Sequence, residues 1–323
     1  RSFGGLFPPS AQLWGTQEKM LRRTITGAAI AVVFIGVLLL GEFVDRAFMS
    51  AFLYIVVAVC ILEVRHALGE RIPKQYNWLI WLYAMLYGLP YFFFGFRGII
   101  FLTILAFIAA CFIAVANNHP DNVLQNIAFL LIYPGVLFST LLYINRSAST
   151  RLILPGDPVY ELVINSLWRG EQLLPYNTVG LSLVFAVSWF TDTGAYIFGT
   201  TFGKHKLCPQ ISPNKTVEGS IGGIFGGLLG AALVFLLFEL NIFGIFRSGL
   251  PVKMSLKILD YVLIGFFGAI FTQLGDLVAS LVKRHCGIKD YSNLLGSHGG
   301  FMDRFDGIIF NSCFVAAIFT FIL

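Results

Sequence analysis

Long apolar runs set the strongest limit on what this chain can fold into. A helix needs about 20 apolar residues to cross the hydrocarbon core of a bilayer, which is about 30 Å thick. The sequence contains nine runs of roughly this length, and none alternates apolar and polar residues as a membrane β-barrel strand would. The runs lie at 24–42, 46–64, 77–95, 98–116, 125–144, 178–200, 218–243, 255–282 and 304–323. The sequence therefore predicts an all-α, polytopic integral membrane protein with about nine transmembrane helices.

The composition excludes several other classes of protein. Only 12% of the 323 residues are charged and 57% are hydrophobic, whereas a soluble domain carries about 25% charged residues. The formal net charge of +5 is too small to indicate a nucleic-acid partner. Five scattered cysteines form no Cys-x-x-Cys pair, which argues against a disulfide framework or a zinc finger. We expect the lipid bilayer as the surroundings and no nucleic acid as a partner.

Lysines and arginines in the loops indicate the orientation, because cytoplasmic loops carry an excess of them. With the N-terminus in the cytoplasm, 13 of these residues fall on the cytoplasmic side and 8 on the other side, leaving Arg1 aside. The sequence therefore predicts a cytoplasmic N-terminus.

The predicted spans are unevenly distributed along the chain. Residues 1–19 are polar and contain Gly and Pro, so we interpret them as an N-terminal extension or a cloning remnant. Residues 20–144 form a five-helix N-terminal membrane region, and 145–177 form a long extracytoplasmic loop. Residues 178–323 hold the last four spans and nearly all the suggestive polar residues, so we predict that they form the catalytic membrane region.

An acidic residue and a basic loop mark the sixth and seventh spans. Asp192 lies inside the sixth span, where an ionisable residue suggests function; the alternative is a helix end near the interface. Ser212, Lys215 and Thr216 follow in one short loop, and lysines with hydroxyls near a helix start suit a phosphate. The alternative is an ordinary basic cytoplasmic loop in which Thr216 is an N-cap.

The last two spans carry a second group of polar residues. Asp276, Ser280 and Lys283 are spaced to share one face of a helix. Asp303 and Asp306 share a face at the start of the last span, where acidic residues also gain from the helix dipole. Carboxylates with lysines and arginines nearby match what a nucleoside triphosphate with Mg²⁺ requires.

One stretch resembles a known family. The 27 residues from Ser280 to Asp306 contain Lys-Arg at 283–284, Lys-Asp at 289–290, Gly-x-His-Gly-Gly at 296–300 and Asp-Arg-Phe-Asp at 303–306. This pattern resembles the signature of the phosphatidate cytidylyltransferase family, also called CDP-diacylglycerol synthases. Residues 192–196 and 211–219 resemble that family too, whereas over 20–144 only the hydropathy agrees.

The resemblance implies a fold, an activity and partners. It implies an all-α membrane enzyme, a homodimer, that transfers the cytidylyl group of CTP to phosphatidic acid, giving CDP-diacylglycerol and pyrophosphate. It implies Mg²⁺ as cofactor, with K⁺ as a candidate second cation, in a polar cavity that faces the cytoplasm. We expect a bacterial inner membrane, with a membrane of a eukaryotic organelle as the alternative.

Site roles follow from that resemblance and from the chemistry of two phosphates. The family's metal ligands carry over to Asp276, Asp303 and Asp306. The expected catalytic residues are Lys283, Arg284, Lys289, Asp290, His298 and Arg304. The expected substrate-binding residues are Ser212, Lys215, Thr216, Ser280 and Asp192. Alternatives stay open for three of these: His298 as a loop-structuring residue, Asp290 as a structural partner of a base, and Asp192 as an orienter of a lysine.

Three other functions remain as alternatives. A CTP-dependent lipid kinase would use similar parts but release CDP instead of pyrophosphate. An isoprenoid-lipid cytidylyltransferase would differ only in its lipid. An ion transporter would use Asp192 and Asp276 along a path, but the sequence has no internal repeat of the kind transporters often show.

Overall fold

The computed structural model describes residues 32–41, 47–146, 176–240, 258–296 and 299–322. The predicted extension 1–19 and nearly all of the predicted loop 145–177 lie outside these residues. The long helices are α2 (Ala47–Leu68), α5 (Phe96–Ala116), α9 (Tyr176–Phe202), α10 (Val217–Phe238), α11 (Ile258–His285) and α12 (Met302–Ile322), and a shorter apolar helix spans Val32–Gly41. The shorter helices are η1 (Gly69–Arg71), η2 (Lys74–Tyr76), α3 (Asn77–Leu86), α4 (Gly88–Phe94), α6 (Asp121–Leu130), η3 (Leu131–Val136) and α7 (Leu137–Arg146).

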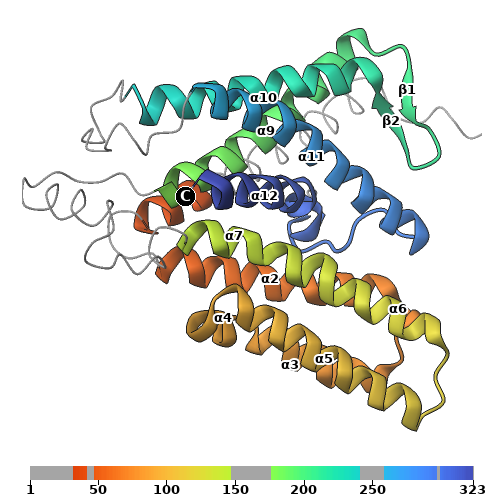
Figure 1. Ribbon diagram of the computed structural model, residues 1–323. Coiled ribbons are helices and arrows are strands. Elements are labelled where there is room, and N and C mark those ends of the chain that lie inside the picture. Colours follow the sequence, from red (N-terminus) through yellow and green to blue (C-terminus); the bar gives the residue numbers. More distant parts are fainter. Residues whose placement is uncertain (1–31, 42–46, 147–175, 241–257, 297–298, 323) are drawn as a thin grey trace, which may run out of the picture.

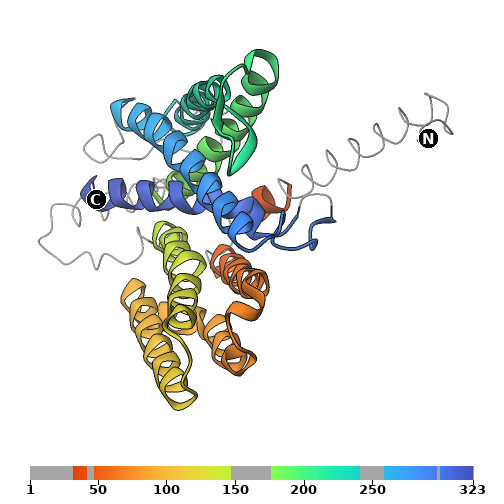
Figure 2. The ribbon, with the colours of Figure 1, turned by 90° about the vertical axis from the view of Figure 1, so that its right-hand side faces the viewer.

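The helices form two packed groups with α12 between them (Figures 1 and 2). Helices α2 to α7 pack against one another in the first group, and α9, α10 and α11 form the second. Helix α12 contacts α9 and α11 on one side and α2 and α7 on the other. One buried apolar core runs through both groups. The last helix therefore joins the two halves of the chain.

The all-α membrane fold is confirmed, whereas the number of nine spans is not. Within the described residues, six helical segments are long and apolar enough to cross a membrane: 47–71, 96–116, 121–145, 178–202, 217–238 and 258–285. Helix α12 has 21 residues, but Asp303, Arg304 and Asp306 lie near its start. The described part of the first predicted span is the short helix Val32–Gly41.

Proline explains why the predicted span 77–95 is divided. The helix stops at Leu86 and resumes as α4 after Tyr87. Pro90 has no N–H to donate to the carbonyl of Leu86, and its ring crowds that carbonyl. Pro134 has a similar effect inside the span 121–145, where the π-helical stretch η3 separates α6 from α7.

A short β-hairpin is the only β-structure among the described residues. Strand β1 (Lys206–Cys208) pairs antiparallel with β2 (Ser212–Thr216), with Lys206 opposite Thr216. Thr216 is the N-cap of α10, because its hydroxyl accepts a hydrogen bond from the N–H of Gly219 at 3.1 Å. The hairpin thus leads directly into the seventh predicted span and fixes where Lys215 lies.

Helices α9 and α10 approach each other closely through glycine. A Cβ at Gly226 would collide with the carbonyl of Phe190, and one at Gly194 would meet the carbonyl of Gly222. Small residues four apart let helix backbones come together in membranes. The glycine pattern of the seventh predicted span is therefore a packing surface.

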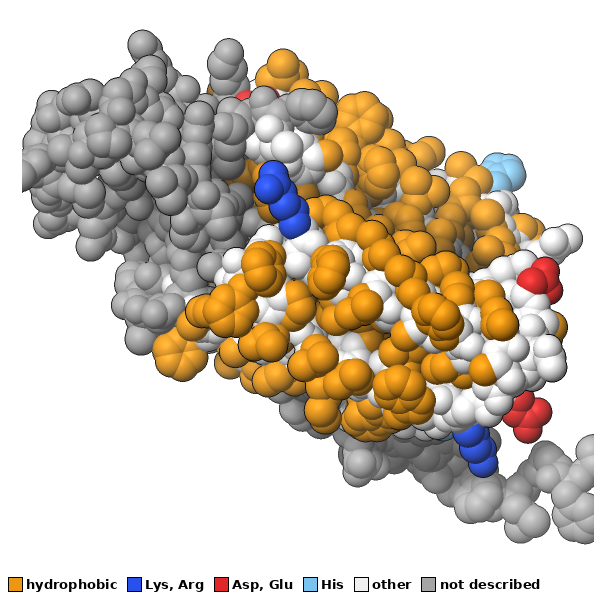
Figure 3. Space-filling view, turned by 60° about the horizontal axis from the view of Figure 1, so that its bottom comes forward, with side chains coloured by type: hydrophobic (Ala, Val, Ile, Leu, Met, Phe, Trp, Pro, Cys, Tyr) orange, Lys and Arg blue, Asp and Glu red, His pale blue; other side chains and the backbone are white. Residues whose placement is uncertain are grey.

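The outer face of α3, α4 and α5 is apolar. Figure 3 shows hydrophobic side chains covering this face, with charged side chains near its rim. Met85, Phe94, Phe101 and Phe112 are among the exposed large side chains there. Such a face suits contact with lipid chains and supports an integral membrane protein.

Basic loops gather at one end of the molecule. The Arg71 guanidinium donates to the carbonyl of His285 at 2.6 Å, which joins η1, directly after α2, to the end of α11. Arg284 donates to the carbonyl of Ile211 at 3.4 Å, which joins α11 to the hairpin. Two basic residues that the sequence assigns to the cytoplasm, Arg71 and Arg284, therefore link different elements at this end of the molecule.

Candidate active site

A buried ion pair lies at the centre of the candidate site. The ammonium of Lys283 on α11 lies 2.7 Å from Oδ1 of Asp303 on α12. The two side chains are 11% and 3% exposed, respectively, so water screens the pair weakly. Lys283 also lies 5.5 Å from the centre of the Tyr291 ring. Burial raises the pKa of the Tyr291 phenol most, and the charges of Asp306 and Asp303 raise it further. The phenol therefore stays neutral.

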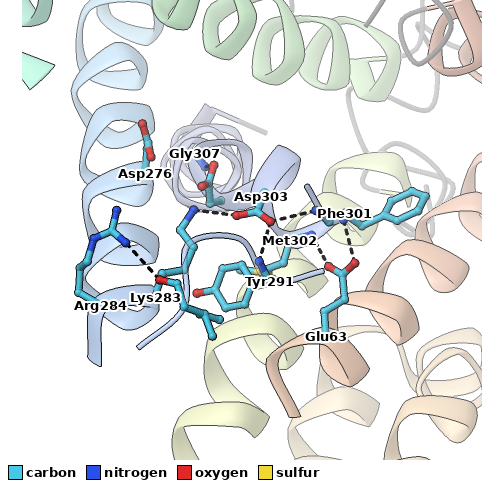
Figure 4. Close-up of polar contacts among 12 residues, drawn as sticks. Glu63, Asp276, Lys283, Arg284, Tyr291, Phe301, Met302, Asp303 and Gly307 are labelled. Atoms are coloured by element: carbon cyan, nitrogen blue, oxygen red, sulfur yellow. Dashed lines mark hydrogen bonds and ion pairs between the residues drawn. The ribbon is translucent and has the colours of Figure 1, made fainter. Parts of the chain in front are cut away.

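Asp303 also holds the loop between α11 and α12. We call the described residues 286–296 and 299–301 the signature loop. Oδ2 of Asp303 accepts hydrogen bonds from the N–H of Tyr291 at 2.8 Å and of Gly300 at 2.9 Å (Figure 4). Gly300 follows Gly299, which has a φ of +77°, in the left-handed region that favours glycine. Both oxygens of Asp303 are therefore engaged within the protein.

A second carboxylate, Glu63 of α2, reaches the same segment from the other half of the chain. Its Oε1 accepts from the hydroxyl of Ser292 at 2.5 Å and from the N–H of Phe301 at 3.1 Å. Its Oε2 accepts from the N–H of Met302 at 2.7 Å (Figure 4). Glu63 is 4% exposed. Two carboxylates from different helices thus fix the signature loop and the start of α12.

A second ion pair links the hairpin to α11. Nζ of Lys215 on β2 lies 2.7 Å from Oδ2 of Asp276. Their side chains are 25% and 36% exposed, so water and small ions can reach this pair. The pair therefore brings together a lysine and an aspartate that lie 61 positions apart in the sequence.

The remaining acidic residues converge on these pairs. Asp306 lies close enough to Asp276, Asp192 and Lys283 for their charges to act on it. Asp192 feels the charges of Asp276, Lys215 and Arg304. The cluster has four acidic members, Asp192, Asp276, Asp303 and Asp306, and three basic members, Lys215, Lys283 and Arg304.

A cavity of about 340 Å³ adjoins this cluster. Its apolar wall includes Phe34 of the helix 32–41, Phe52 of α2, Trp189 of α9 and Ile308 of α12. Its polar lining residues are Asp192, Asp303, Arg304 and Asp306. Asp192 is exposed and lines this cavity. The cavity therefore offers apolar and charged surfaces side by side.

The acidic cluster provides oxygen donors of the kind that Mg²⁺ prefers. Within the described part of the chain, no three His, Cys, Asp or Glu side chains are already arranged as a metal cage. Mg²⁺ commonly binds through one or two carboxylates together with substrate phosphates and water, so such a cage is not required. Asp276 and Asp306 fit that role; Asp303 as a ligand stays a prediction, since both its oxygens already accept hydrogen bonds.

Several predicted site residues make no described contact with the charged cluster. Arg284 is exposed and donates to the backbone carbonyls of Ile211 and Ile288. Lys289 and Asp290 are exposed and make no polar side-chain contact with another described residue. His298 lies outside the described residues. The catalytic roles expected for these four residues stay predictions.

The expected substrate-binding residues fall into two groups. Thr216 is 7% exposed and caps α10, as its alternative interpretation stated, while Ser280 is 9% exposed on α11. Ser212 is half-buried on β2, the strand that also carries Lys215. Lys215 and Asp192 belong to the charged cluster. Binding of substrate by these residues stays a prediction.

Glu63 holds the segment beside the site, and the sequence interpretation missed it. A signal was available, because Glu63 is the acidic residue within the predicted span 46–64 and such residues suggest function. Its donors are a serine and two backbone N–H groups located 229 to 239 positions later. No spacing rule connects positions so far apart.

Comparisons with known proteins agree with the signature. The model of the cytidylyltransferase family matches residues 21–322. The phosphatidate cytidylyltransferase of Staphylococcus haemolyticus (strain JCSC1435) is 48% identical over 126 residues, which cover 39% of this chain and 43% of that protein. The protein of the same name from Staphylococcus aureus (strain COL) is 47% identical over 128 residues, with the same coverage. These matches span less than half the length of either relative. Since the family model covers nearly the whole chain, the chain belongs to the cytidylyltransferase family.

Proposed function

We propose that this protein transfers the cytidylyl group of CTP to phosphatidic acid, forming CDP-diacylglycerol and pyrophosphate. The observation that carries the proposal is a cluster of carboxylates and basic side chains that adjoins an apolar cavity, in a member of the cytidylyltransferase family. Relatives named phosphatidate cytidylyltransferases support the choice of lipid.

The reaction needs electrostatic help more than a base. An oxygen of the phosphatidic acid phosphate attacks the α-phosphorus of CTP, and the bond from that phosphorus to the bridging oxygen of the β-phosphate breaks. Pyrophosphate leaves with that bond's electrons. The nucleophile is already an anion, so the main task is to bring two highly charged phosphates together.

Basic side chains of the cluster would perform that task. Lys215 and Lys283 each lie 2.7 Å from a carboxylate, so both are held in fixed positions before substrate arrives. Arg304 lines the cavity and can form two parallel hydrogen bonds to a phosphate. We assign Lys215 and Lys283 to the triphosphate and Arg304 to the lipid phosphate.

We propose Mg²⁺ as the cofactor, held by Asp276 and Asp306 together with the substrate phosphates. When bound, it would neutralise phosphate charge at the α-phosphorus and at the leaving pyrophosphate. Asp192 faces the cavity beside these carboxylates and is a further candidate ligand. A second cation such as K⁺ remains part of this proposal.

The cavity suits the junction between a phosphate and acyl chains. Phe34, Phe52 and Trp189 offer apolar contact beside the charged lining. A volume of about 340 Å³ is enough for the glycerol phosphate and the first carbons of the chains. The rest of each chain would extend into the bilayer.

Membrane location and assembly complete the proposal. The basic loops at one end of the molecule support a site that faces the cytoplasm, and the staphylococcal relatives support a bacterial cell membrane. We also propose a homodimer, which light scattering of the detergent-solubilised protein would test. A monomer mass would contradict that part alone.

The decisive experiment is an assay with purified protein in detergent. Phosphatidic acid, Mg²⁺ and CTP labelled in the cytidine are supplied, with EDTA and Asp306→Asn as controls. The proposal predicts a chloroform-soluble cytidine product and an equal amount of pyrophosphate, both lost in the two controls. A parallel reaction with a polyprenyl phosphate tests the isoprenoid alternative.

Other products would contradict the proposal in different ways. Release of CDP with a newly phosphorylated lipid would identify a kinase. Turnover with the polyprenyl phosphate alone would change the lipid but keep the chemistry. Folded protein without any CTP turnover would leave ion flux in liposomes as the next measurement.

A further inference from the structure

Glu63 is a buried carboxylate that belongs to neither the cluster of aspartates nor the lipid cavity. It is 4% exposed on α2, and no ion pair joins it to a described basic residue. A buried charge is expensive unless hydrogen bonds compensate it. Three donors do so here: the Ser292 hydroxyl and the N–H groups of Phe301 and Met302.

Two of these donors are at the N-terminus of α12. The first N–H groups of a helix have no partner within the helix. The carbonyl of Phe301 accepts from Arg304 at 2.9 Å and from Phe305 at 3.1 Å, so Phe301 is the cap residue. Glu63 therefore caps α12 from a different helix, and the positive end of the α12 dipole stabilises its charge.

The first turn of α12 carries three residues of the candidate site. Asp303, Arg304 and Asp306 all follow Met302 within four positions. Asp303 in turn accepts the N–H of Gly300, the residue just before those that Glu63 binds. The position of this turn, and with it the position of the acidic pair, depends on where Glu63 holds Phe301 and Met302.

We propose that Glu63 is a positioning residue for the cytidylyltransferase site. Its carboxylate, supplied by the N-terminal half, sets the start of α12 and the signature loop, so that Asp303, Arg304 and Asp306 are placed for reaction. The catalytic part of this inference rests on the proposed function, whereas the contact itself does not. Glu63 touches no reacting atom. It acts through the backbone segment that carries Asp303, Arg304 and Asp306.

The test compares Glu63→Gln with the matched control Glu70→Gln. Both replace a glutamate by its amide, but Glu70 is exposed on η1, seven positions away. The Glu63→Gln change keeps the length of the side chain and removes one of its two acceptor oxygens, which leaves at least one of the three donors unpaired. Ser292→Ala removes a donor without changing the carboxylate.

Hydrogen exchange by mass spectrometry gives a readout that needs no substrate. In Glu63→Gln, we expect the amides of residues 299–302 to exchange at least about tenfold faster, because a lost hydrogen bond lowers the local opening free energy. The exchange rates of amides in α9 and α10 should stay unchanged. In Glu70→Gln, every exchange rate should match that of the wild type. Unchanged exchange at 299–302 in Glu63→Gln would overturn the proposal, even if the wild-type protein turned over no CTP.

Kinetics per folded molecule give the second readout. We expect kcat of Glu63→Gln to fall about 10- to 100-fold, with KM for CTP changed less than about threefold, because a displacement near 1 Å can cost about 100-fold. Ser292→Ala should show a smaller fall, and the double variant should lose less than the product of the two effects. A kcat within about twofold of wild type, or faster exchange spread over the whole protein, would overturn the proposal.

Discussion

The two halves of this molecule use the membrane differently. Helices α3 to α5 present apolar side chains outward and contribute no residue to the charged cluster. Helices α9, α11 and α12 carry the aspartates of the cluster and a buried lysine. From the first half, Glu63 supplies its charge to the second, and the helix 32–41 and α2 supply apolar cavity wall. The comparison shows that the charged cluster of the second half depends on the first half for a hydrogen-bonding carboxylate and for an apolar cavity wall.

The largest expected effect belongs to the acidic centre of the second half. Asp306→Asn keeps the size of the side chain and removes one charge from a group of aspartates. We expect CTP turnover to fall at least about 100-fold, the size seen when one electrostatic contact to a transition state is lost. The assay with cytidine-labelled CTP measures this turnover.

The matched control for this change is Asp121→Asn. Asp121 is exposed at the start of α6 in the first half. Its turnover should equal that of the wild type. Equal losses in both variants would abolish the contrast between the halves.

Breaking the central ion pair should reduce both stability and activity. Lys283→Met leaves the Asp303 charge buried without its cation, which costs about 3–5 kcal/mol in the free energy of unfolding. We expect a lower midpoint of thermal unfolding in detergent, together with a large loss of turnover. Lys289→Met, at an exposed position, should change the midpoint little. A similar midpoint for both variants would show that the pair does not support the fold.

Close helix packing predicts an intermediate effect. Gly226→Ala places a Cβ against the carbonyl of Phe190 and forces α9 and α10 apart. Overpacking of this kind costs about 1–3 kcal/mol. Thermal unfolding should show it, whereas Gly36→Ala, where a Cβ meets nothing within 4 Å, should not. Equal midpoints for the two variants would contradict the packing assigned to the α10 glycines.

The smallest effect is expected on the lipid-facing surface of the first half. Phe101 is 68% exposed on α5. Phe101→Leu exchanges one apolar surface for another against lipid chains, so we expect a change within about 0.5 kcal/mol and full turnover. Phe138→Leu, at a fully buried position of α7, should cost more. A larger loss at Phe101 would indicate that this face packs against protein instead.

Hydropathy predicted the class of fold because it records a sum over many residues. The break at Pro90 and the hairpin at 206–216 depend on single positions, and hydropathy registers neither of them. The signature stretch indicated Lys283 and Asp303, and the structure joins them in an ion pair that spacing could not specify. Lys215 proved to be the partner of Asp276, a pairing that only the hairpin explains.

Glu63 shows where sequence interpretation ends. One acidic residue changes the mean hydropathy of a span very little, so the run 46–64 still reads as apolar. Two of its three partners are backbone N–H groups, which every residue except proline carries, so no residue type marks them. Only the position of α12 against α2 selects those groups.

The long separation between Glu63 and its donors has a consequence for biosynthesis. During synthesis the ribosome delivers α2 to the membrane 229 to 239 residues before Ser292, Phe301 and Met302 emerge. Throughout that interval the glutamate must stay near water or exchange temporary partners, since an unpaired charge in lipid is costly. We therefore expect α2 to settle at its final depth only after α12 has arrived, which makes synthesis of α12 a requirement for assembly of the first half.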